Sequence, residues 1–203
     1  ECIASCSSTR SKQASRSIML IKKLAQSILK LAKWDVVINV NIPLPDKCVI
    51  SIAPHTSNWD FILCQLAIRS VGIHSGFLMK ETWFFWPLGN MFRAMGGIAV
   101  PRKKGGRLTN SIIEAAKRSD KFVIAVTPEG TRSYNEHWRK GFLHIAYGAN
   151  LPIYLAYLDF KNKVVALDKE FAYTGNIDDD LKAVKTYYKD IPAKYPDKFG
   201  TGL

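Results

Sequence analysis

The sequence lacks any uninterrupted apolar run long enough to cross a lipid bilayer. Such a run needs about 18 or more consecutive apolar residues, and no stretch of this chain reaches that length. We therefore expect a chain that crosses no membrane, although it can still lie on a membrane surface. The GxSxG sequence is also missing, so the nucleophile elbow of a serine hydrolase is not indicated.

Cysteine is scarce and is not arranged for metal binding or cross-linking. The four cysteines, Cys2, Cys6, Cys48 and Cys64, form no CxxC pair and have no histidine cluster beside them. Neither a zinc site nor a disulfide framework is indicated. We expect a reducing compartment.

Acidic residues are outnumbered, which favours anionic partners. The 203 residues hold 29 Lys and Arg against 17 Asp and Glu, a formal net charge of +12. Residues 1–104 contribute 14 basic and 5 acidic groups, a net charge of +9, so the excess lies mainly in the N-terminal half. A positive surface of this kind attracts anionic lipid or nucleic acid, and motifs must decide between them.

The N-terminal region divides into two parts. Residues 1–17 are small, polar and basic, and indicate a flexible leader or an expression remnant. Residues 18–34 place apolar side chains three and four positions apart, with lysines on the opposite face. Such a helix either lies in a lipid interface or packs on its own domain.

The remaining chain alternates β-rich runs with helical patterns, which is typical of an α/β domain. We predict one domain over residues 35–203, with a mixed, largely parallel central sheet flanked by helices. The predicted strands cover 48–53, 76–79, 97–100, 122–126 and 153–160, and a hairpin strand follows residue 160. The predicted helices cover 58–71, 86–95, 108–119, 140–148 and 178–189.

Three polar groups follow predicted strands, where open α/β sheets collect their sites. In "SIAPHTSNWDF", Asp60 lies one helical turn beyond His55 and can orient it as a base; alternatively, the two residues are unrelated loop and helix-start groups. "TPEGTRS" and "GGIAVPRKKGGR" place charges and glycines in turns. These two stretches form either a binding site or ordinary solvated loops.

Together these groups resemble the glycerolipid acyltransferase family. Its HxxxxD block matches His55 and Asp60, its strand-then-arginine block resembles "GGIAVPR" with Arg102, and its PEGTRS block matches residues 128–133. A weaker block resembles "LPIYLAY". The likeness covers roughly residues 48–160. Thr127 stands where the family usually has an aromatic residue, and this departure bears on the choice of acceptor.

The resemblance implies acyl transfer from acyl-CoA or acyl carrier protein to a hydroxyl of a lysophospholipid such as lysophosphatidate, in phospholipid biosynthesis. His55 is the implied general base and Asp60 its partner. The implied ligands of the acceptor phosphate are Arg102, Glu129, Gly130, Thr131 and Arg132, and backbone amides near Gly130 are an expected oxyanion site. The acyl donor is a substrate, so no cofactor is expected.

The resemblance also implies that the protein acts at the cytoplasmic face of the cell membrane as a peripheral membrane protein. The expected contacts with anionic lipid are the 18–34 helix and an aromatic set made of Trp34, Trp83, Phe84, Phe85 and Trp86. A buried aromatic cluster is the alternative. Two other functions stay open: a membrane-surface thioester or lipid hydrolase, and a non-catalytic anionic-lipid-binding domain. Nucleic acid is not an expected partner.

Overall fold

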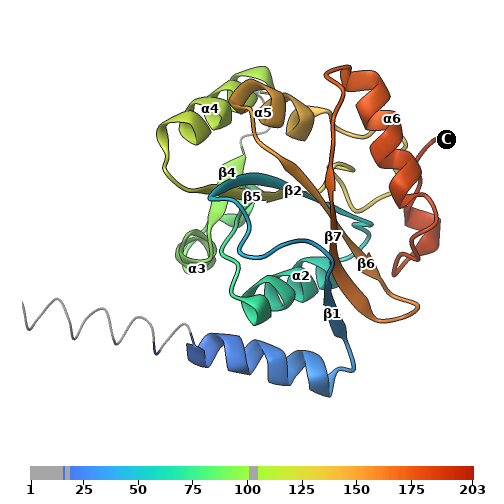
Figure 1. The fold of residues 1–203 in the computed structure, drawn as a ribbon. Helices are drawn as coiled ribbons and strands as arrows, with labels where there is room; N and C mark the ends of the chain where they lie inside the picture. Colours follow the sequence, from blue (N-terminus) through green and yellow to red (C-terminus); the bar gives the residue numbers. More distant parts are fainter. Residues whose placement is uncertain (1–15, 17–18, 101–104) are drawn as a thin grey trace, which may run out of the picture.

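The computed structural model describes residue 16, residues 19–100 and residues 105–203. It contains a seven-stranded sheet between two layers of helices (Figure 1). The strand order is β1-β7-β6-β2-β5-β3-β4, and β6 with β7 is the antiparallel pair in an otherwise parallel sheet. The predicted α/β class with a largely parallel, mixed sheet is confirmed.

The elements lie close to where the sequence places them. The strands are β1 (Asp35–Ile38), β2 (Lys47–Ala53), β3 (Gly76–Lys80), β4 (Gly97–Val100), β5 (Phe122–Val126), β6 (Ile153–Asp159) and β7 (Val164–Phe171). The helices are α2 (Asn58–Val71), α3 (Leu88–Ala94), α4 (Gly105–Arg118), α5 (Gly141–Ala149) and α6 (Ile177–Tyr188), with short 3-10 turns η1 (Glu81–Trp83) and η2 (Pro196–Lys198). Strand β1 was not predicted, because its four residues are too few to show a period.

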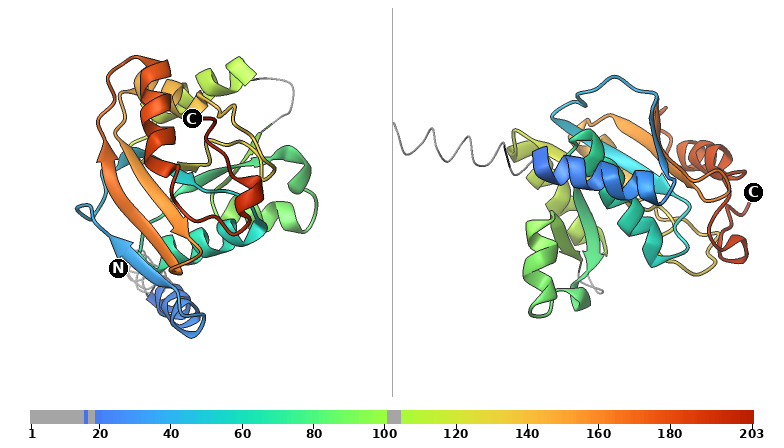
Figure 2. Two further views of the ribbon diagram at one scale, coloured as in Figure 1. Left: turned by 90° about the vertical axis from the view of Figure 1, so that its right-hand side faces the viewer. Right: turned by 90° about the horizontal axis from the view of Figure 1, so that it is seen from below.

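Two hydrophobic cores form because each strand turns alternate side chains to opposite faces of the sheet. Val49 packs in the core beneath α4, α5 and α6, whereas Ile50 packs in the core beneath α2 and the N-terminal helix. Figure 1 shows these two helical layers above and below the sheet, and the two further views in Figure 2 agree with it. The central strands β2 and β6 are therefore buried on both sides.

The N-terminal helix covers residues 19–31 and packs on the domain by a narrow strip. Leu29 is buried in the core beneath α2, and Gln26 Nε2 donates to the Ser70 carbonyl oxygen at 2.9 Å. The helix ends before residue 34, because Lys33 has a φ of 57°. Ala25 is also buried, whereas the larger apolar residues of the helix other than Leu29, among them Leu24 and Leu31, are exposed. The predicted leader, residues 1–17, lies outside the described residues except for residue 16.

Membrane spans can be sought only in the described part of the chain. None of its helices is long and apolar enough to span a bilayer.

The C-terminal helix α6 is tied to the centre of the sheet by one buried hydroxyl. Tyr188 is fully buried, and its OH lies 2.7 Å from the Ser51 carbonyl oxygen and 3.1 Å from that of Ala156. Ser51 belongs to β2 and Ala156 to β6, so this contact holds the strand before the His55 loop against α6.

We predict that Tyr188→Phe lowers the free energy of unfolding by about 1–2 kcal/mol, because the buried carbonyl oxygens lose a donor. Urea denaturation followed by circular dichroism measures the change. Tyr134→Phe is the matched control, since Tyr134 is 57% exposed. Equal stability of the two variants would contradict a structural role for the Tyr188 hydroxyl.

Candidate active site

The site lies beyond the carboxyl ends of β2 and β5, which are parallel neighbours in the middle of the sheet. Helix α2 follows β2 on one face, and α5 follows β5 on the other (Figure 1). The loops after the two strands therefore leave in opposite directions, and this arrangement opens a crevice at the sheet edge. His55 lies in the first loop and Glu129 in the second.

Asp60 organises the loop that carries His55. Ser57 is the N-cap of α2, and Asp60 occupies the third helical position. The carboxylate of Asp60 accepts from the backbone N–H groups of Thr56 and Ser57 at 2.6 and 2.7 Å, and from the Ser57 hydroxyl at 2.6 Å. This capping box fixes the loop immediately after His55.

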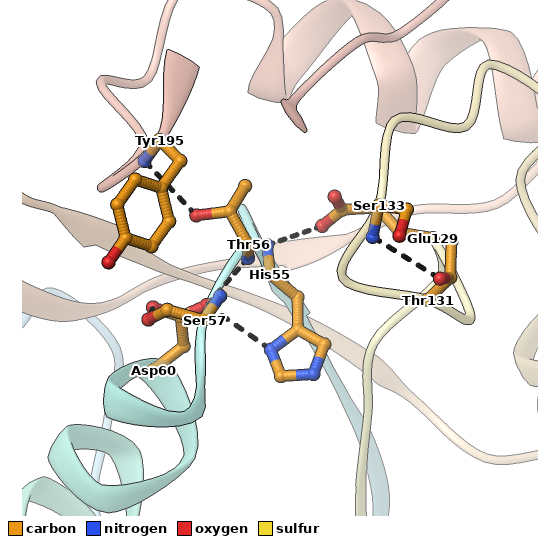
Figure 3. Close-up of polar contacts among 8 residues, drawn as sticks. All are labelled: His55, Thr56, Ser57, Asp60, Glu129, Thr131, Ser133 and Tyr195. Carbon is orange, nitrogen blue, oxygen red and sulfur yellow. Dashed lines mark hydrogen bonds and ion pairs between the residues drawn. The ribbon is translucent and has the colours of Figure 1, made fainter. Parts of the chain in front are cut away.

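The same carboxylate faces the imidazole ring. Asp60 Oδ2 lies 3.3 Å from His55 Nδ1, and Asp60 is only 2% exposed, whereas 19% of the His55 side chain is exposed (Figure 3). A buried carboxylate on Nδ1 stabilises an imidazolium and leaves Nε2 to exchange a proton with a substrate. The structure therefore brings His55 and Asp60 into contact, and their roles as base and orienting group stay a prediction.

Glu129 turns inward to the loop that carries His55. Its Oε1 accepts from the backbone N–H of His55 at 2.6 Å, and the residue is 2% exposed. Burial raises the pKa of Glu129 to about 8; the nearby Asp60 adds to the rise, and donation from the His55 N–H opposes it. Sequence reasoning missed this contact, because nothing in PEGTRS shows that its glutamate reaches a backbone 74 residues away.

The rest of the second loop is a tight turn. Gly130 has a φ of 68°, and a Cβ there would lie 2.8 Å from Cγ of Arg139, so glycine is required. Its N–H donates to the Thr127 carbonyl oxygen at 3.1 Å. The Gly130 N–H is therefore occupied in this structure, and an oxyanion site made by other backbone amides near Gly130 stays a prediction.

Two further predicted ligands lie in the same loop. Thr131 Oγ1 accepts from the Ser133 N–H at 3.3 Å. Arg132 borders the crevice together with residues 56–59 of the first loop and α2. Arg102 lies outside the described residues, beyond the end of β4.

The aromatic set divides into inward and outward members. Trp34 packs edge-on against Phe160 with ring centroids 5.0 Å apart, and Phe84 contacts Phe92 at 6.2 Å. The others, Trp83, Phe85 and Trp86, are exposed. Within the described residues, no group of three His, Cys, Asp or Glu side chains is placed to hold a metal ion.

Comparison with known proteins identifies the class. The family model described as Acyltransferase matches residues 33–158, which is more than half of the chain. The chain therefore belongs to the acyltransferase family, and its class is that of an O-acyltransferase. No curated protein matches the chain.

A solved structure is similar in fold. The crystal structure of the 1-acyl-sn-glycerophosphate (LPA) acyltransferase PlsC from Thermotoga maritima aligns with a TM-score of 0.63 and 20% sequence identity. The alignment covers 92% of this chain and 84% of that one. The family resemblance read from HxxxxD and PEGTRS is thus confirmed, and the α/β fold agrees with it.

We predict a pH-dependent effect of Glu129→Gln on stability, because the variant keeps the acceptor for the His55 N–H and cannot ionise. The pKa of the Glu129 carboxyl is raised from its ordinary value of 4.5 to about 8 in the folded protein. As the pH rises between these two pKa values, this carboxyl group therefore destabilises the fold. The stability of the wild type relative to the variant should fall over this range, by at most about 1.4 kcal/mol for each pH unit.

Urea unfolding at pH 5, 6.5 and 8 measures this difference. Glu81→Gln is the control, since Glu81 is exposed. If the difference in unfolding free energy between Glu129→Gln and the wild type does not change with pH, the result would contradict burial of an ionisable Glu129.

Proposed function

We propose that the protein transfers a fatty acyl group from acyl-CoA or acyl carrier protein to a hydroxyl of a lysophospholipid such as lysophosphatidate, in phospholipid biosynthesis. The observation that carries the proposal is the contact of His55 Nδ1, in the loop after β2, with the buried carboxylate of Asp60. Membership of the acyltransferase family supports it.

In the proposed mechanism, His55 Nε2 removes the proton from the acceptor hydroxyl as its oxygen attacks the thioester carbonyl carbon. The imidazolium that forms is stabilised by Asp60, which stays ionised. Collapse of the tetrahedral intermediate breaks the carbon–sulfur bond, and the departing thiolate takes the proton from His55. The products are an ester and a free thiol, and no covalent bond to the enzyme is needed.

Acceptor binding is assigned to the charged groups around the base. Arg132 borders the crevice, and Arg102 is proposed as a second cation for the acceptor phosphate, as the family likeness implies. Glu129 serves this site indirectly, because its carboxyl group holds the His55 backbone. We therefore assign Glu129 a positioning role in place of direct contact with the acceptor.

We further propose that the protein binds the cytoplasmic face of the cell membrane as a peripheral protein. The N-terminal helix presents Leu20, Leu24 and Leu31 to solvent at 60, 61 and 87% exposure. An exposed leucine stripe beside lysines suits an interface in which apolar burial and attraction to anionic headgroups act together. The exposed Trp83, Phe85 and Trp86 add a second apolar surface.

We predict that His55→Ala lowers the rate of acyl transfer by about 100-fold or more, the usual contribution of a general base. Purified protein is incubated with radiolabelled acyl-CoA and a panel of lysolipids in mixed micelles, and thin-layer chromatography separates the products. His144→Ala is the control, because His144 is exposed on α5, and it should keep wild-type turnover.

Each outcome of this assay has a definite meaning. Label in one lysolipid identifies the acceptor, whereas label released as free fatty acid without dependence on an acceptor identifies a hydrolase. Near-normal transfer by His55→Ala would remove His55 from the mechanism. If the wild type is inactive with both acyl-CoA and acyl carrier protein as donors, a non-catalytic lipid-binding domain becomes the leading alternative.

We predict that replacing Leu20, Leu24 and Leu31 together by serine weakens binding to vesicles that contain phosphatidylglycerol by about tenfold or more, because apolar burial in the interface is lost. Co-sedimentation measures the bound fraction. Ile42→Ser is the control, since Ile42 is a 52% exposed apolar residue outside the helix. Unchanged vesicle binding by the triple variant would indicate that the helix only packs on its own domain.

A further inference from the structure

A pocket of about 410 Å³ opens beside the catalytic loop and includes residues from the C-terminal end of the chain. Residues 56–59 form one wall, Arg132 and Ser133 form a second, and Tyr195 and Lys198 form the third. The matched family region ends at residue 158. The third wall therefore comes from a part of the chain to which the family match assigns nothing.

Contacts to the catalytic loop hold this C-terminal wall in place. The Tyr195 backbone N–H donates to Thr56 Oγ1 at 3.3 Å, and Thr56 is the residue after His55 (Figure 3). Further along, Trp138 Nε1 donates to the Gly200 carbonyl oxygen at 2.9 Å. Lys198 lies between these two anchors, so its backbone is fixed beside the loop.

The charges that border the pocket are positive. Within the described part of the chain, neither Arg132 nor Lys198 has a carboxylate partner, and no acidic side chain lines the pocket. Lys198 Nζ instead lies 4.6 Å from the centre of the Tyr195 ring. Two cations that share a pocket repel each other, and an anion placed between them removes that repulsion.

The anion that suits this pocket is a phosphate group. Guanidinium and ammonium groups donate charge-assisted hydrogen bonds to phosphate oxygens, and the volume exceeds what one simple inorganic ion needs. Figure 3 shows the side chains of Thr56 and His55 leaving the loop in opposite directions. The pocket thus adjoins the base without occupying the space in front of its imidazole ring.

We propose that Lys198, from the C-terminal segment, completes a phosphate-binding site with Arg132 and holds a phosphate group of one of the two substrates. That group belongs either to the headgroup of the lysophospholipid or to the thioester donor. The assignment of the phosphate to a substrate rests on the function proposed above, whereas binding of phosphate by the pocket does not.

Binding is tested first without any reaction. Inorganic phosphate is titrated into the full chain, and amide chemical shifts are followed by NMR. We expect saturable amide shifts in residues 56–59 and in residues 195, 197 and 198, and an apparent affinity about tenfold or more lower in Lys198→Gln. Lys182→Gln removes the same charge from an exposed site on α6 and should match the wild type. Equal affinity in Lys198→Gln and Lys182→Gln would overturn the proposal.

Steady-state kinetics then identify the source of the phosphate. Lys198→Gln should raise the KM for one substrate about tenfold and leave kcat within twofold, since Lys198 does not touch the reacting atoms. A raised KM for lysophosphatidate assigns the site to the headgroup, and a raised KM for acyl-CoA assigns it to the donor. Unchanged values of both KM would refute the substrate assignment. Inactive wild-type protein that still binds phosphate through Lys198 would refute only the proposed function.

Discussion

The structure of the site depends on a single buried carboxylate. Asp60 accepts hydrogen bonds from Thr56 and Ser57 and faces His55 Nδ1 at 3.3 Å. A carboxylate removed from water requires such partners, so the start of α2 and the orientation of the His55 loop form together. The same group that caps the helix is therefore the group that faces the imidazole of His55.

The sheet supplies the second constraint. Parallel pairing of β2 with β5 brings the loops that follow them to one edge, and Glu129 then reaches the His55 N–H. The His55 loop is held from two directions, by Asp60 from the helix that follows it and by Glu129 from the loop after the neighbouring strand β5. Because both supports are buried, the position of the imidazole is determined by the core and not by solvent-exposed loops.

Much of the fold could be predicted from the sequence because its elements are locally encoded. Apolar strands such as β5 and the periodic helix α2 were placed with the correct bounds. Strand β1 was missed, since four half-exposed residues carry no clear period. The inward packing of Trp34 also could not be predicted from the sequence, because aromatic residues are common both in a protein core and at a membrane surface.

By itself, the sequence determined the α/β class, the acyltransferase family and the pairing of His55 with Asp60, since these follow from short motifs and local periodicity. Only the tertiary structure decided that Glu129 points to the His55 backbone and that Lys198 borders the pocket of Arg132. These relations join residues far apart in the chain, and such pairs meet only after the strands have paired and the C-terminal segment has packed across the loop.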